Sequence, residues 1–345
     1  MITKAMAGYI PTEQDMIDGL QPIRTFMLTI NIYHLFETGL YDDLIENGPD
    51  TVAALADRFD FDADKLEAFL KYLRTEEIIE QSGDRYGLSE QAKLMRYDRS
   101  HYTFFVGGYT ETFMQVGEKL KKDSGWATRN LRQVAIGSKE TQRYDTPPVL
   151  RRLISQIPGE CTRLLDVGCG NGHALLAVLD MLPEIREAMG VDPGKESCDE
   201  AVAEVEAQGM SDRVRIVNMS STEFIQSDID YDPHLLILGY VIQEILGQEG
   251  RESVVRFISE LIDRFPKLHI ILMEVDMQWD SPVMQHPYAK AFYNPYYLIH
   301  AFTNQKLETL AFWEEIFDEC NLEIVTREYL DTTHLIPAYL MRRKA

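Results

Sequence analysis

Cysteine, basic residues and long apolar runs are scarce in this chain of 345 residues, and each shortage excludes a class of protein. The four cysteines show neither paired spacing nor a zinc pattern, so we expect reduced thiols. No apolar run approaches the roughly 20 residues that cross a bilayer. Residues 1–15 lack the apolar core of a signal peptide. We therefore expect a cytoplasmic protein without a membrane partner.

Positive charge is also in deficit. The chain has 34 Lys and Arg against 56 Asp and Glu, which gives a net charge of −22 at pH 7. Such a chain repels polyanions, so nucleic acids and anionic lipid surfaces are disfavoured as partners and a small-molecule substrate is favoured. Apolar residues, in contrast, are plentiful. A hydrophobic content of 45% suits a large core, and the length suits two domains.

The N-terminal part of the chain has a winged-helix pattern. A capped helix at Thr51–Phe59 and a second helix at Asp64–Arg74 precede a hairpin within residues 76–90. In a DNA reader the second helix would be basic, yet residues 62–77 hold five acids against three bases, which argues against DNA binding. The apolar stretch Ile23–Leu40 is either an ordinary core helix or a surface that a partner subunit buries.

We expect three regions: a winged-helix-like domain at 1–100, a helical linker region at 101–146, and a larger domain at 147–345. From residue 147 onward strands alternate with helical stretches, which predicts βαβ units. The expected fold class is therefore α/β, with a Rossmann-like, doubly wound, mostly parallel sheet preceded by the helical domain. The predicted strands are 163–168, 187–192, 213–219, 234–240, 268–275, 323–330 and 338–343.

Residues 164–173, LLDVGCGNGH, place three glycines between a strand and a helix. The apolar residues suit a buried strand, and Gly168, Gly170 and Gly172 suit a turn with positive φ or a close backbone approach. Backbone N–H groups at such a helix start can hold a ligand. Asp192, about 20 residues past the glycines at the end of the next strand, could accept hydrogen bonds from both hydroxyls of a ribose.

The glycine spacing departs from the dinucleotide fingerprint G-x-G-x-x-G and resembles motif I of the class I S-adenosylmethionine-dependent methyltransferases. The resemblance implies S-adenosylmethionine as cofactor. Met219 would pack on the adenine, and Ser220 or Ser221 would accept from its amino group or cap the next helix. The alternatives are a purely structural turn with a capping aspartate and a site for a different nucleotide. The candidate cofactor-binding residues are Asp166, Gly168, Gly170, Gly172, Asp192, Met219, Ser220, Ser221 and Tyr240.

The order of the domains resembles the two-domain small-molecule O-methyltransferases, in which a winged-helix-like module forms the dimer interface. This resemblance implies a homodimer. In that family the segment after the fourth strand ends in a His-Asp pair, and the histidine is the general base. Gln243 and Glu244 stand there in this chain, and glutamine cannot take a proton at neutral pH. Glu244 is therefore a candidate base, or else a solvated residue at a helix start.

The aromatic segment after the fifth strand resembles bacterial C-methyltransferases that act on the β-carbon of 2-oxo acids. Those relatives can hold a metal through two histidines, so a divalent or ferric ion is a candidate cofactor, but only His300 remains here. Carbon methylation next to a ketone needs a base and a stabilised oxyanion. The candidate catalytic residues are Glu244 as base, His300 as acid or ligand, and Gln243 as carboxamide donor. Packing against neighbouring tyrosines is the alternative role of His300.

Three functions stay open at this point. The first is S-adenosylmethionine-dependent methylation of a small molecule, with C-methylation of a 2-oxo acid at its β-carbon as one form. The second is O-methylation of a hydroxylated aromatic metabolite. The third is a dimeric sensor that binds the cofactor without catalysis. The sequence does not choose the methylated atom, the base, the metal or the oligomeric state.

Overall fold

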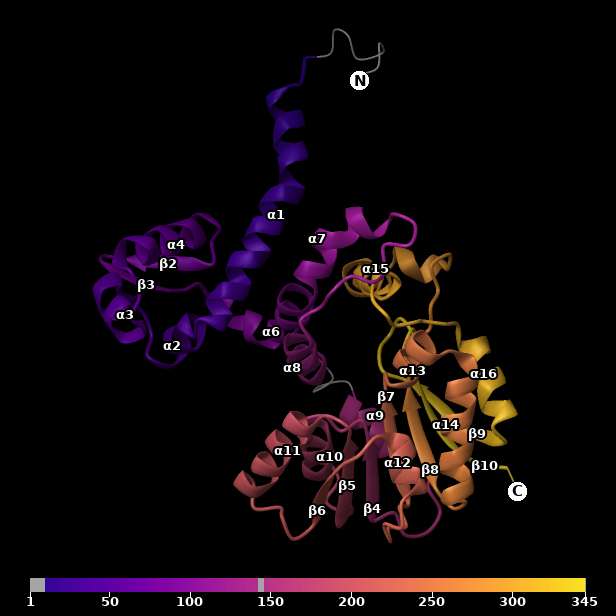
Figure 1. The fold of residues 1–345 in the computed structure, drawn as a ribbon. Coiled ribbons are helices and arrows are strands. Elements are labelled where there is room, and N and C mark those ends of the chain that lie inside the picture. The colour runs from indigo at the N-terminus through magenta and orange to yellow at the C-terminus, as the bar shows by residue number, and fades with distance from the viewer. Residues whose placement is uncertain (1–9, 142–145, 345) are drawn as a thin grey trace. The chain divides into compact units, whose positions relative to one another are not determined.

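A computed structural model describes residues 10–141 and 146–344 (Figure 1). These residues form two compact units. The first contains the described part of Met1–Thr110 and Asn130–Thr141, and the second contains Glu111–Arg129 and the described part of Gln142–Ala345. Residues 101–146 thus contribute to both units. The predicted domain limits at 100 and 146 stay predictions.

The first unit is mainly helical and contains the predicted helix pair and hairpin. Thr51 and Asp62 begin the two helices, because their side chains accept hydrogen bonds from the backbone N–H groups of Ala54 and Lys65. Its helices are α1 (Glu13–Glu37), α2 (Leu40–Glu46), α3 (Val52–Phe59), α4 (Ala63–Thr75), α5 (Glu90–Leu94), η2 (Met95–Tyr97), α6 (Arg99–His101), η3 (Tyr102–Gly108) and α8 (Leu131–Thr141). Its antiparallel strands, in the order β1-β3-β2, are β1 (Asp50–Thr51), β2 (Ile79–Ser82) and β3 (Arg85–Leu88).

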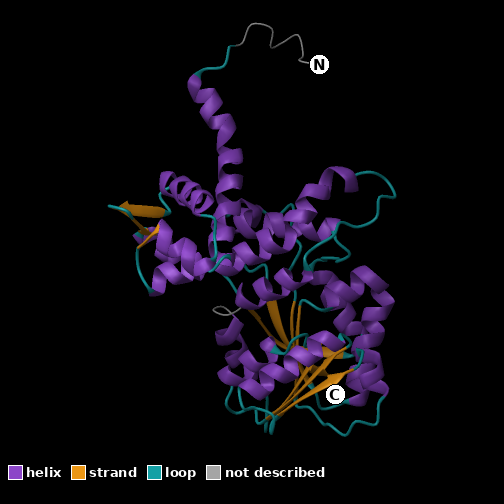
Figure 2. Cartoon of the chain, turned by 60° about the vertical axis from the view of Figure 1, so that its left-hand side comes forward, coloured by secondary structure: helices purple, strands orange, loops and turns teal. Residues whose placement is uncertain are grey.

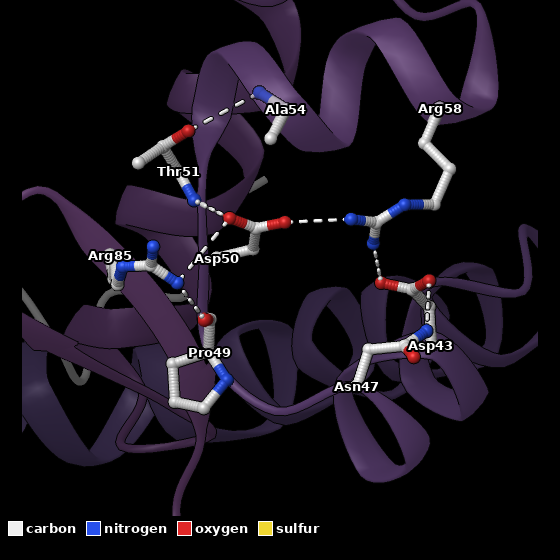
Figure 3. Close-up of polar contacts among 8 residues, drawn as sticks. All are labelled: Asp43, Asn47, Pro49, Asp50, Thr51, Ala54, Arg58 and Arg85. Carbon is white, nitrogen blue, oxygen red and sulfur yellow. Dashed lines mark hydrogen bonds and ion pairs between the residues drawn. The ribbon is translucent and has the colours of Figure 1, made fainter.

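A polar network joins α2, α3 and β1 within this unit (Figure 3). The Arg58 guanidinium of α3 contacts the Asp43 carboxylate of α2 and lies 2.7 Å from Asp50 Oδ2. Arg85 lies 3.6 Å from the other oxygen of Asp50. The Thr51 backbone N–H and Arg58 hold the pKa of Asp50 below its usual range. This network fixes the start of α3 and is structural.

The second unit consists of one large sheet and its covering helices. Its strands are β4 (Arg163–Val167), β5 (Glu187–Asp192), β6 (Val214–Asn218), β7 (Leu235–Gly239), β8 (His269–Met273), β9 (Leu322–Tyr329) and β10 (Pro337–Arg343). Its helices are most of α7 (Tyr109–Lys119), α9 (Thr146–Ile154), α10 (His173–Met181), α11 (Lys195–Ala207), α12 (Ser221–Gln226), α13 (Ile242–Glu249), α14 (Arg251–Arg264), η4 (Pro282–Gln285), η5 (Ala289–Tyr293), α15 (Asn294–Phe302) and α16 (Leu310–Glu319).

The seven strands lie in the order β6-β5-β4-β7-β8-β10-β9. All pairs from β6 to β8 are parallel, and β10 runs antiparallel to both β8 and β9. The chain builds outward from β4 through β5 to β6 and then returns to β7 on the other side of β4. Ligands of doubly wound sheets bind at such a reversal, beyond the carboxyl ends of the strands. The predicted fold class is confirmed.

Helices pack against this sheet (Figure 2), and the sequences of its strands reflect the resulting burial. The central strands are nearly continuous apolar runs, as expected for parallel strands that are covered on both faces. Residues 270–273 of β8, for example, are at most 2% exposed. Helix α14 contributes Val254, Phe257, Ile258 and Leu261 to the same core. Within the described ranges, no helix has the length and apolar character needed to cross a membrane.

Candidate cofactor and active site

The glycine loop after β4 has the geometry of a ligand-binding turn. Gly168 has a φ of 82° and Gly170 a φ of 53°, both in the left-handed region. A Cβ built on Gly170 would meet no described atom within 4 Å, and one on Gly168 would approach only Val241 Cγ2, at 3.9 Å. The two positions therefore border open space. A side chain at either position would enter that space.

Gly172 serves a different purpose in the same loop. Its φ is 75°, and a Cβ there would lie 3.0 Å from the Cβ of Ala201 in α11. Its missing side chain allows α10 and α11 to pack closely. Cys169 fills the space over the neighbouring strand, because a Cβ on Gly190 of β5 would lie 2.8 Å from Cys169 Sγ. Burial raises the pKa of that thiol, which disfavours the reactive thiolate, so Cys169 serves as a packing residue.

Asp192, at the end of β5, connects two loops. Its Oδ2 accepts a hydrogen bond of 3.0 Å from the Gly170 N–H, and its Oδ1 accepts one of 2.8 Å from the Gly194 N–H. An ionised carboxylate can accept about four hydrogen bonds, so these two leave acceptor capacity for hydroxyl groups. The residues therefore fit S-adenosylmethionine: a glycine-rich loop lies beside a carboxylate that backbone groups hold in place.

Asp166 lies in β4, directly before the glycine loop. Burial, together with the charge of Asp192, raises the pKa of Asp166 to about 7. The two carboxyl groups of this site therefore differ in character. Backbone N–H groups hold Asp192 in place, whereas Asp166 titrates near neutral pH.

The end of β6 contains the predicted adenine-side residues. Met219 is half-buried, and its N–H donates to the Asp192 carbonyl at 3.0 Å. Ser220 is the N-cap of α12 in a capping box, since its Oγ accepts from the Glu223 N–H while Glu223 Oε2 accepts from the Ser220 N–H. The capping role considered for these serines therefore applies to Ser220. Ser221 is the first residue of α12, and adenine contacts stay a prediction.

Tyr240 follows β7 at the sheet reversal. Its φ is 61°, which is rare for a residue with a side chain. Its N–H donates to the Met273 carbonyl at 2.9 Å, so the turn is tied to the end of β8. This turn leads from the cofactor loop side of the sheet into α13, which contains Gln243 and Glu244.

Gln243 and His300 are brought together although 57 positions separate them. Gln243 is 2% and His300 3% exposed. Gln243 Nε2 lies 3.5 Å from His300 Nε2 and 3.5 Å from the Tyr296 hydroxyl. The ring of Tyr296 lies against that of His300, with centroids 4.0 Å apart. His300 thus lies beside Gln243 and packs against a neighbouring tyrosine, which was its alternative role, while its catalytic role stays a prediction.

The contacts of His300 favour one tautomer. Its Nδ1 lies 2.7 Å from the Tyr296 carbonyl oxygen, which can only accept, so Nδ1 carries the proton. Nε2 then has a lone pair directed toward Gln243. Burial, and to a lesser extent the charge of Arg129, lower the pKa of His300 to about 3. The imidazole is therefore neutral at physiological pH, and Nε2 is its unprotonated nitrogen.

Glu244, the next residue of α13, belongs to a separate polar group. Its Oε1 accepts from Arg129 Nη2 at 3.0 Å and from Gln305 Nε2 at 2.9 Å. Arg129 reaches it from the segment 111–129, whose Ala127 N–H donates to the Phe302 carbonyl at 2.8 Å. This arrangement places a cation beside the buried Gln243–His300 pair.

Glu274, directly after β8, lies beside this group and was not singled out from the sequence. It is 1% exposed, and its Oε1 accepts from the backbone N–H groups of Ile242 at 3.0 Å and Gln243 at 3.4 Å. Its Oε2 is buried without a hydrogen-bond partner in the part of the chain that the structure describes. Burial, opposed by the two N–H groups and aided by Glu244, raises the pKa of Glu274 well above its usual range. A glutamate at the end of the apolar run LHIILMEV was the available signal.

Two tyrosines of the aromatic segment after β8 have internal structural contacts. The Tyr293 hydroxyl contacts the Asp331 carboxylate, and the Tyr297 hydroxyl donates to the Asp276 carbonyl at 2.6 Å. Both rings are buried. The candidate metal is not supported, because no group of three or more His, Cys, Asp and Glu side chains that could hold an ion occurs among the described residues.

A doubly wound sheet with this glycine loop and acidic second strand defines a class I S-adenosylmethionine-dependent methyltransferase. The 2-ketoarginine methyltransferase of Streptomyces arginensis is 36% identical over 343 residues, which cover 96% of this chain and 97% of that enzyme. The chain belongs to this methyltransferase family and is an enzyme of small-molecule metabolism. No protein-family model matches it.

Two solved structures share the fold over nearly the whole chain. The structure of mitomycin 7-O-methyltransferase has a TM-score of 0.66 at 14% identity and covers 96% of this chain and 97% of its own. The S-adenosylhomocysteine-bound form of CalO1, a methyltransferase in calicheamicin biosynthesis, has a TM-score of 0.60 at 17% identity, with 97% and 100% covered. At these identities the likeness establishes the fold.

Proposed function

We propose that the enzyme methylates a 2-oxo acid on its β-carbon, C3. The observation that carries the proposal is the buried pair of His300 and Gln243, in which a neutral imidazole directs Nε2 toward the Gln243 carboxamide. The activity of the Streptomyces arginensis relative, a 2-ketoarginine methyltransferase, supports the substrate class. The cofactor supplies the methyl group as an electrophile on a sulfonium and leaves as a thioether.

Four residues of the site have distinct roles in this reaction. Arg129 binds the substrate carboxylate, because a guanidinium matches a carboxylate and lies beside the buried pair. His300 Nε2 takes the C3 proton, since its lone pair is the accepting position. Gln243 orients the substrate through its carboxamide. Glu244, predicted as the base, is better suited to positioning Arg129, because Oε1 already accepts two hydrogen bonds.

The same pair of residues argues against the two rival functions. O-methylation of a phenol through the family's histidine requires a base where Gln243 stands, and a carboxamide does not accept protons near pH 7. A sensor without catalysis would not need a buried imidazole held in one tautomer. Both rivals nevertheless give clear outcomes in the same assay.

The test is incubation with S-adenosylmethionine and two panels of acceptors, one of 2-oxo acids and one of phenols. We expect methylation of a 2-oxo acid, with the new methyl group located on C3 by NMR. The 2-oxo acid panel contains 2-ketoarginine, phenylpyruvate and 4-methyl-2-oxopentanoate. Methylation of phenols alone would establish the O-methylation reading. Cofactor binding without turnover on either panel would favour the sensor.

Variants of the positioning residues refine this test. Arg129→Met should raise KM for the 2-oxo acid because it removes the charge-assisted pair with the substrate carboxylate, while Lys290→Met, at an exposed position, should have no effect. His300→Gln should abolish exchange of the C3 hydrogens with deuterated water and leave cofactor affinity unchanged. Retained exchange in His300→Gln would contradict the assignment of the base.

We also propose that the enzyme is a homodimer and that α1 contributes to the interface. The helix exposes a stripe of large apolar residues at helical spacing, each 49% to 58% exposed: Met16, Leu20, Ile23 and Met27. Such a stripe on a helix is typical of a surface that another chain covers. Sedimentation of the intact protein tests the oligomeric state.

A further inference from the structure

Glu274 raises a chemical question that the proposed base does not answer. Removing the C3 proton of a 2-oxo acid moves an electron pair onto the C2 oxygen, and that oxygen needs a hydrogen-bond donor. Two neighbouring donors are already in use: His300 donates its Nδ1 proton to the Tyr296 carbonyl, and Arg129 donates to the Glu244 carboxylate. The neutral carboxamide of Gln243 is the remaining donor of this group. A buried group with an unused polar atom beside them is therefore of interest.

The position of Glu274 meets this need. It follows β8 at the carboxyl edge of the sheet, and its Oε1 contacts the first backbone N–H groups of α13. Gln243 connects the parts of the site, because its N–H lies 3.4 Å from Glu274 Oε1 and its Nε2 lies 3.5 Å from His300 Nε2. Glu274 and His300 therefore flank the same residue.

The two oxygens of Glu274 differ in their surroundings. Oε1 faces two N–H donors and must accept from them. Oε2 is buried, with no hydrogen-bond partner among the described residues, which is costly for a group that could ionise. A proton on Oε2 removes the charge and converts the unused atom into an O–H donor. Burial, which holds the pKa of Glu274 well above its usual range, acts in the same direction.

We propose that Glu274 is a further catalytic residue, whose Oε2–H donates a hydrogen bond to the C2 oxygen of the 2-oxo acid. The inference rests on the proposed function. In the step, the C3–H bond breaks and its proton passes to His300 Nε2. The electron pair forms the C2–C3 double bond, and the carbonyl π electrons move to the C2 oxygen that Glu274 stabilises. When C3 bonds to the methyl group, the S–CH3 bond of the sulfonium breaks with its electron pair left on sulfur, and the C2 carbonyl forms again. His300 then releases its proton to solvent.

The experiment compares wild type, Glu274→Met, Glu274→Gln and the exposed control Glu252→Gln. Exchange of the C3 hydrogens of 2-ketoarginine in deuterated water is followed by NMR with S-adenosylhomocysteine bound, across a pH series. Titration calorimetry with S-adenosylhomocysteine checks that each variant retains the cofactor site.

Loss of the donor in Glu274→Met should slow exchange by about 100- to 1000-fold, the usual effect of removing one oxyanion donor. Glu274→Gln keeps an acceptor for the two N–H groups and an N–H donor, so it should retain more exchange. In the wild type, exchange should decline as alkaline pH ionises Glu274. Glutamine cannot ionise, so Glu274→Gln should remove that decline, a result that a purely structural role would not produce.

Two results overturn the inference alone while the wild type still methylates a 2-oxo acid. One is wild-type exchange in Glu274→Met, and the other is an unchanged alkaline decline in Glu274→Gln. If Glu274→Met fails to bind S-adenosylhomocysteine, the pH series of Glu274→Gln decides. A wild type that methylates no 2-oxo acid overturns both the proposed function and this inference.

Discussion

Alanine substitutions at Gly170 and Gly172 should separate ligand binding from packing within one loop. Both glycines have positive φ, and an alanine in the left-handed region costs roughly 1–2 kcal/mol. At Gly170 the added methyl group enters open space, so the free energy of unfolding should fall by about that amount alone. At Gly172 the methyl group would lie 3.0 Å from Ala201 Cβ, and overpacking adds roughly 1–3 kcal/mol.

Cofactor affinity should be reduced more by Gly170→Ala than by Gly172→Ala. If the space at Gly170 belongs to the cofactor, the same overpacking cost of roughly 1–3 kcal/mol falls on binding and weakens it about 5- to 150-fold. Gly172→Ala should bind almost normally once folded, because its methyl group points at α11. Titration calorimetry with S-adenosylhomocysteine measures affinity, and denaturant unfolding followed by fluorescence measures stability.

Gly209→Ala is the matched control for both variants. Gly209 follows α11, has a φ of 66°, and would place its Cβ within 4 Å of no described atom. It therefore isolates the backbone cost of positive φ, and its cofactor affinity should equal that of the wild type. If Gly170→Ala binds S-adenosylhomocysteine as tightly as Gly209→Ala, the open space at Gly170 is not occupied by the cofactor. An unchanged stability of Gly172→Ala would refute the packing argument.

Asp192→Ala should lose about 1.5–3 kcal/mol of cofactor-binding free energy for each hydrogen bond removed. An affinity that titration calorimetry finds unchanged would contradict the assignment of Asp192 to the ribose. Folding raises the pKa of Asp166 from 3.8 to about 7, so the folded state loses stability as pH rises through this window. Above pH 7 the Asp166→Asn variant should therefore unfold at a higher denaturant concentration than the wild type, whereas below pH 4 this difference should be absent. Folding lowers the pKa of His300 from 6.5 to about 3, so the free energy of unfolding should fall as pH drops through that window. This fall should be less steep in His300→Gln, and denaturant unfolding followed by circular dichroism measures it. Leu20→Glu in the stripe of α1 should shift sedimentation toward monomer, whereas Gln21→Glu on the same helix should not; an unaffected dimer would place the interface elsewhere.

The features that the sequence predicted well are those with a local cause. The central parallel strands of the large sheet could be predicted because parallel strands buried on both faces leave apolar runs in the sequence. Thr51 and Asp62 marked helix starts because an N-cap acts on N–H groups three residues away. The glycine loop could be found because Gly168 and Gly170 need positive φ.

The features that the sequence did not predict depend on contacts between distant segments. Arg129 meets Glu244 across 115 positions, and Glu274 meets the Ile242 N–H across 32. Neither pair has a periodic or spaced pattern. Even Gly172, correctly placed in the loop, has a packing partner in α11 that the loop sequence cannot reveal. Burial decides the character of Glu274 and His300, and burial of one polar residue is a property of the assembled sheet.

Gln243 stands where the resemblance to small-molecule O-methyltransferases implies a histidine. This difference has a physical consequence for the whole site. A carboxamide carries no charge at any physiological pH, so it can be 2% exposed without the cost of burying an ion. The proton chemistry must then come from its neighbours. In the proposed mechanism His300 accepts through Nε2, because the Tyr296 carbonyl fixes its tautomer. Burial is the main cause of the lowered pKa of His300, and the charge of Arg129 adds a smaller effect. An anionic substrate bound at Arg129 would offset that smaller effect, so the proposed mechanism links substrate binding to the basicity of His300 only through this electrostatic contribution.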